Sequence, residues 1–73
     1  MADYILYAPQ GDLRLIADKI AVLGGTVQGI LPVSGIIHFA ADPMLVRSIA
    51  VLPGVVRVDR DDATRAIAGG ASS

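Results

Sequence analysis

The chain of 73 residues holds few side chains that could carry out chemistry. His38 is its only histidine, and it contains no cysteine and no glutamate. An imidazole without a thiolate or neighbouring carboxylates in the sequence is more typical of a structural residue than of a metal ligand or a catalytic base. We therefore predict that the protein is not an enzyme and that it binds no metal or cofactor.

A small acidic cluster, formed by Asp59, Asp61 and Asp62, lies near the end of the chain. Paired carboxylates can hold a cation or serve in acid–base catalysis. Here arginines interleave with the acids, at positions 57, 60 and 65. Two interpretations stay open: a solvated strand end, or part of an interaction surface.

The composition excludes some kinds of partner and indicates where the protein is expected in the cell. The net charge of −1 gives no basic footprint for a nucleic acid, and no run of about 20 apolar residues could span a membrane. The N-terminal residues lack the basic and apolar segments of a secretory signal. As written, the chain is expected in the cytoplasm, or outside the cell if a signal was removed.

A short internal echo predicts the architecture that must position these side chains. Residues 20–28 return with small changes at residues 49–57. Each copy reads Ile-Ala-Val-Leu, then Gly-Gly or Pro-Gly, then two β-branched residues, Thr-Val or Val-Val. This is typical of a helix that stops at glycine and leads into a strand. Two such units in one short chain predict two βαβ halves in a single sandwich.

The remaining pattern completes this sandwich. Strands are expected over residues 3–8, 26–31, 35–41 and 55–59. Asp12 and Asp42 occupy helix N-cap positions, and Pro43 fits a first helical position. The order β-α-β-β-α-β predicts an α+β, ferredoxin-like fold, in which both helices cover one face of a four-stranded antiparallel sheet. This domain spans residues 1–61, and residues 62–73 follow as an extended C-terminal tail.

Alternation along the strands assigns side chains to the two faces of the expected sheet. The residues expected beneath the helices are Ile5, Tyr7, Val27, Ile37, Phe39, Val56 and Val58. Those expected on the opposite face are Tyr4, Leu6, Gln28, Ile30, Ile36, His38 and Arg57. An uncovered face that mixes apolar and polar groups is typical of a protein interface. Self-association through this face is the alternative.

Four motifs, in this order and spacing, resemble a known family. They are Tyr-Ile-Leu-Tyr at residues 4–7, Leu-Gly-Gly-Thr-Val at 23–27, Phe-Ala-Ala at 39–41, and Leu-Pro-Gly-Val-Val-Arg-Val-Asp-Arg-Asp at 52–61. The chain is similar over residues 3–67 to the propeptide domains of subtilisin-type serine proteases and to the stand-alone inhibitors related to them. The resemblance implies that this protein inhibits a subtilisin-like serine protease and assists its folding as a chaperone would.

The resemblance also implies how each region binds the protease. The uncovered sheet face would pack on two parallel surface helices of the enzyme, through Ile30, Ile36, His38 and Arg57. Asp59 and Asp61 would cap the N-termini of those helices, where a carboxylate is favoured. The tail would pair as an added strand in the active-site cleft. The tail residues assigned to this contact are Asp62, Ala63, Thr64, Arg65, Ala66 and Ile67, the last in the primary specificity pocket.

Two further expectations concern the state of the free protein. Residues 68–73 end the chain where a propeptide would continue into its enzyme, so we expect either a free-standing inhibitor or a scaffold kept for another interaction. The dense apolar stripes and the two helix starts predict a folded monomer. The alternative function is a ferredoxin-like regulatory or oligomerisation module, which would bind a small ligand or a protein partner. In such a module the turn at residues 10–12 would face the ligand.

Overall fold

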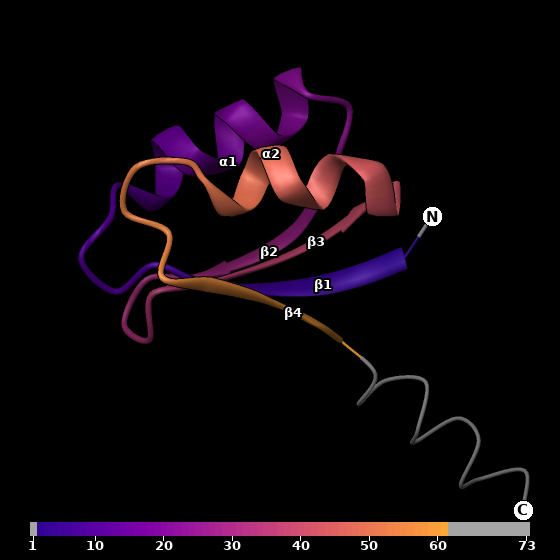
Figure 1. Ribbon diagram of the computed structural model, residues 1–73. Helices are drawn as coiled ribbons and strands as arrows, with labels where there is room; N and C mark the ends of the chain where they lie inside the picture. Colours follow the sequence, from indigo (N-terminus) through magenta and orange to yellow (C-terminus); the bar gives the residue numbers. More distant parts are fainter. Residues whose placement is uncertain (1, 62–73) are drawn as a thin grey trace, which may run out of the picture.

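The computed structural model describes residues 2–61 (Figure 1). Its elements, in chain order, are β1 (Ala2–Tyr7), α1 (Leu13–Val22), β2 (Thr26–Leu31), β3 (Ile36–Ala41), the 3-10 turn η1 (Pro43–Leu45), α2 (Val46–Ala50) and β4 (Arg57–Arg60). The predicted tail, residues 62–73, lies outside the described residues.

The four strands form one antiparallel sheet in the order β2-β3-β1-β4. Both helices cover the same face of this sheet, as Figure 1 shows. The predicted α+β, ferredoxin-like arrangement is therefore confirmed. It differs from a strict β-α-β-β-α-β order by the 3-10 turn η1, which precedes the short helix α2.

Side-chain caps explain where the helical segments begin. The Asp12 carboxylate accepts a hydrogen bond from the backbone N–H of Leu15 at 3.1 Å, so it satisfies one of the free donors at the start of α1. Asp42 does the same for the N–H of Met44 at 3.0 Å, one residue after Pro43. Both predicted N-caps are confirmed.

The sequence echo corresponds to equivalent positions in the two halves of the fold. Ile20 in α1 and Ile49 in α2 occupy the same place in the echo, and both are fully buried. Each copy then turns at a glycine with positive φ, but at different positions of the echo: +105° at Gly24, which aligns with Pro53, and +89° at Gly54, which aligns with Gly25. Glycine adopts this conformation without a steric penalty. At Gly54 the site also lacks space, because a Cβ would lie 2.7 Å from the Cα of Gly11.

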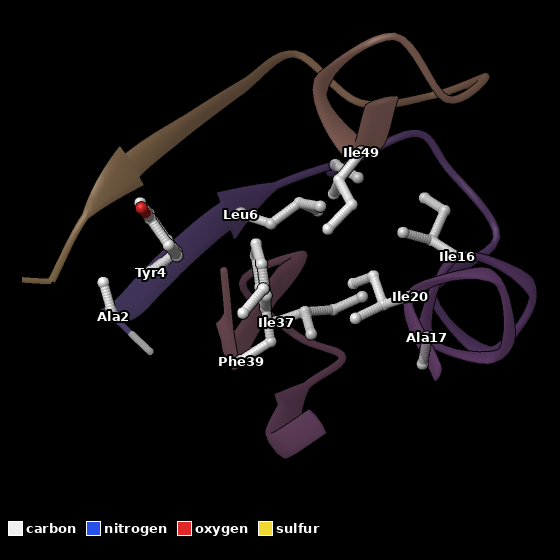
Figure 2. Packing of buried hydrophobic residues seen from close by; sticks show 11 residues of the cluster. Ala2, Tyr4, Leu6, Ile16, Ala17, Ile20, Ile37, Phe39 and Ile49 are labelled. Carbon is white, nitrogen blue, oxygen red and sulfur yellow. The ribbon is translucent and has the colours of Figure 1, made fainter. Parts of the chain in front are cut away.

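The hydrophobic core fills the layer between the sheet and the two helices (Figure 2). Its largest fully buried side chains are Phe39, Leu6, Ile20, Ile37 and Ile49. The Tyr4 and Phe39 rings stack with their centroids 5.5 Å apart, an arrangement that joins β1 to β3. The face of the sheet away from this core is not covered by any described element.

The start of β4 differs from the sequence-based expectation. The turn after α2 continues through Val55, whose N–H donates to the Leu52 carbonyl at 3.1 Å, and β4 begins at Arg57. Val56 precedes the strand and is 68% exposed, so its expected place beneath the helices is wrong. Val58 and Val27 do pack against the core, as predicted.

Candidate functional site on the open face of the sheet

Strand pairing defines the surface opposite the helices, which we name the open face. Ile37 and Phe39 are fully buried beneath the helices, so alternation turns Ile36 and His38 the other way. Antiparallel partners share a face, and the register pairs these two residues and their neighbours across β1 and β4. The open face consists of Asp3, Ile5, Tyr7, Gln28, Leu31, Ile36, His38, Arg57, Asp59 and Asp61.

The prediction for β1 assigned the two faces the wrong way round. Tyr4 is 7% exposed and Leu6 is fully buried, so both lie in the core rather than on the open face. Ile5 and Tyr7 lie on the open face instead, half-buried beside His38 and Ile36. Both faces of this central strand are apolar, so hydrophobicity alone does not distinguish them. The charge of Asp3 is the missed signal, because it shares the parity of Ile5 and Tyr7.

Ile30 is also displaced from the open face, by an irregularity in β2. The register between β2 and β3 shifts between Val27 and Gly29, as in a β-bulge. An extra residue reverses the alternation beyond it. Ile30 consequently pairs with the buried Ile37 and lies on the helix side, so its predicted place is wrong. Gly29, a glycine inside a strand, is the sequence signal for such a bulge.

Arg57 lies on the open face as predicted, and two neighbours orient it. Its guanidinium lies over the Tyr7 ring, 4.6 Å from the centroid, and its Nε is 3.0 Å from the Asp59 carboxylate. The side chains of Arg57 and Asp59 are 62% and 48% exposed. Exposed ion pairs contribute little stability. The arrangement instead presents an ordered cation and an accessible carboxylate on one edge strand.

Asp61, the second predicted capping acid, has a different environment. Its side chain is only 11% exposed, and its Oδ2 lies 3.5 Å from Nδ1 of His38. Its backbone N–H donates to the carbonyl of Asp3 at 2.9 Å. The structure therefore brings His38 and Asp61 together, a contact that sequence reasoning missed.

Gln28 remains on the open face, as predicted, at the β2 end of the surface. Its Nε2 donates to the Asp3 carboxylate at 3.3 Å, which links the edge strand β2 to β1 over β3. The contact between His38 and Asp61 likewise crosses an intervening strand on the open face. Both contacts order polar groups around the apolar centre.

Other features bear on the alternative functions. Within residues 2–61, no three histidine or acidic side chains are grouped so that they could hold a metal ion. Two hollows lie on the helix side, one lined by Lys19, Val22, Leu23 and Leu52, the other by Pro43, Met44 and Arg47. The turn at residues 10–12, which the ligand-binding alternative would use, lines neither of these two hollows.

Comparison with known proteins adds no relative from which a role could be transferred. No family model matches the chain, and neither a curated protein nor a solved structure matches it. Of the helices within residues 2–61, none is long and apolar enough to cross a membrane. The predicted contacts of residues 62–67 with a protease fall outside the described residues.

Proposed function

We propose that this protein inhibits a subtilisin-like serine protease by docking its open face on the enzyme and placing residues 62–67 in the active-site cleft. The observation that carries the proposal is the make-up of the open face. Half-buried Ile5, Tyr7 and Ile36 form its centre, and Arg57 and Asp59 of β4 lie along one side, followed by Asp61. An apolar centre with a charged margin is the usual anatomy of a protein interface.

The apolar centre would supply most of the binding free energy. Burial of an aliphatic side chain contributes about 1.5–3 kcal/mol, and the residues at the centre of an interface dominate its affinity. Ile5 and Ile36 stand on adjacent strands, together with Tyr7, so one helix or strand of a partner would contact all three.

The charged margin would set the orientation of the complex. Asp59 is exposed and uses one carboxylate oxygen for Arg57, which leaves capacity for further hydrogen bonds. The free N–H groups at a helix N-terminus are suitable donors, and the helix dipole favours the negative charge there. The positive charge of Arg57 would be repelled by the positive end of a helix dipole. Docking registers that bring a helix N-terminus to Arg57 would therefore be disfavoured, which leaves the register at Asp59.

The chain continues from Asp61 into residues 62–73, at the end of β4. An extended segment in a protease cleft pairs with the enzyme through main-chain hydrogen bonds. Inhibition of this kind occupies the cleft as a product would, and it requires no catalytic group from the inhibitor. The contact on the open face, which is larger than that of the tail alone, would lengthen the lifetime of the complex.

Replacement of Ile5 by lysine tests whether the open face is the docking surface. We expect the inhibition constant against subtilisin to rise at least ~10-fold, because the interface loses a buried side chain and gains a charge that must be desolvated. The matched control is Val22→Lys on α1, since Val22 is 87% exposed and faces away from the sheet. Equal inhibition by the Ile5→Lys variant and the wild type would refute docking through the open face.

A further inference from the structure

Asp61 differs from the other aspartates that the structure describes. Asp3, Asp12, Asp18, Asp42 and Asp59 are all exposed, whereas the side chain of Asp61 is 11% exposed. Removal of a carboxylate from water is unfavourable unless a partner compensates. The position of Asp61 therefore depends on the groups that contact it.

His38 supplies the side-chain partner, from a strand that does not adjoin β4. In the sheet order β2-β3-β1-β4, β1 separates the strand of His38 from that of Asp61. The 3.5 Å contact between His38 Nδ1 and Asp61 Oδ2 thus crosses β1 on the open face. On the backbone, the Asp61 N–H donates to the Asp3 carbonyl of β1 at 2.9 Å. Asp61 is held at two points, by two different strands.

We propose that His38 is a positioning residue, which holds Asp61 against the sheet and so fixes the point from which residues 62–73 continue. This inference rests on the proposed function, in which those residues enter the protease cleft. A segment whose first residue is already fixed loses less conformational entropy on binding than one that starts from a frayed strand end. His38 thereby strengthens inhibition by limiting where the tail can begin.

The contact itself is tested in the free 73-residue protein, without any protease. We expect His38→Phe and Asp61→Ala each to lower the equilibrium constant for folding roughly two- to fivefold. The double variant should lower this constant by no more than the larger of the two single effects. Exchange of the Asp61 amide hydrogen should become several-fold faster in His38→Phe, while the Leu6 amide in the core keeps its rate. Additive effects of the two substitutions, or an unchanged Asp61 amide, would overturn the inference.

The functional part is tested by inhibition of subtilisin. His38→Phe is expected to raise the inhibition constant about three- to fivefold, and His38→Gln, which retains a side-chain N–H donor, to restore most of the loss. A purely structural role would not distinguish phenylalanine from glutamine once both variants fold. If the wild type inhibits and His38→Phe inhibits equally well, His38 has no positioning role and the proposed function stands. If the wild type does not inhibit at all, the proposed function fails, and the stability cycle and the Asp61 amide decide the positioning of residue 61.

Discussion

Removal of residues 62–73 is expected to raise the inhibition constant against subtilisin by at least ~100-fold, the equivalent of about 3 kcal/mol. Main-chain pairing of an extended segment supplies several hydrogen bonds of roughly 0.5–1.5 kcal/mol each, and the shortened protein would lose all of them. Residues 2–61 form a complete four-stranded sheet and a buried core beneath the helices, so the shortened protein should retain its fold. Inhibition kinetics and far-ultraviolet circular dichroism measure the two properties separately.

A shorter deletion provides the matched control. Removal of residues 68–73 alone leaves the proposed cleft-binding residues 62–67 in place, and we expect inhibition close to that of the full chain. Loss of inhibition only in the longer deletion would locate the active segment between the two cut points. Undiminished inhibition after removal of residues 62–73 would contradict the cleft mechanism.

Replacement of Phe39 by alanine is expected to have the largest effect on stability. Phe39 is fully buried in the layer beneath the helices and stacks on Tyr4, so the substitution leaves a cavity and removes a ring contact. Such changes cost about 3–5 kcal/mol, against a total of roughly 4–11 kcal/mol for a domain of this size. We expect the melting temperature to fall by at least ~12 °C, as measured by thermal denaturation.

Val33 in the loop between β2 and β3 offers a control of similar chemistry. It is fully exposed, so Val33→Ala should leave the melting temperature nearly unchanged. A small effect of Phe39→Ala, equal to that of Val33→Ala, would mean that the core does not lie between the sheet and the helices.

The order and type of the elements were predictable from sequence because local signals agreed with one another. Asp12 and Asp42 cap the helical segments as their positions suggest, and a glycine with positive φ follows each helix, Gly24 after the first and Gly54 after the second. Consistency among caps, turns and apolar spacing is the property that lets a sequence specify one fold. These signals act over a few residues, so they can be recognised without knowledge of the tertiary structure.

The assignment of faces was harder, because it depends on a period of two residues. In β1 both parities are apolar, and only the charge of Asp3 distinguishes the open face. In β2 the bulge near Gly29 moves Ile30 to the helix side. A shift of one residue exchanges the two faces of a strand. A sequence-based list of surface residues is therefore vulnerable to a single irregularity.

The contact between His38 and Asp61 was beyond sequence reasoning for a different reason. The two residues are far apart in the chain, and their strands are not neighbours in the sheet. Their contact depends on the register of three strands together, which local patterns do not specify. The sequence placed His38 on the uncovered face, as the structure does, but gave no sign that it contacts Asp61 there.

Titration of active subtilisin with the purified chain decides whether this protein acts as a protease inhibitor. With the enzyme well above the dissociation constant, we expect a linear loss of peptidase activity that is complete at one inhibitor per enzyme, and a dissociation constant of ~1 μM or lower. Full enzyme activity at about 100 μM of the chain, together with rapid degradation of the chain itself, would contradict the claim.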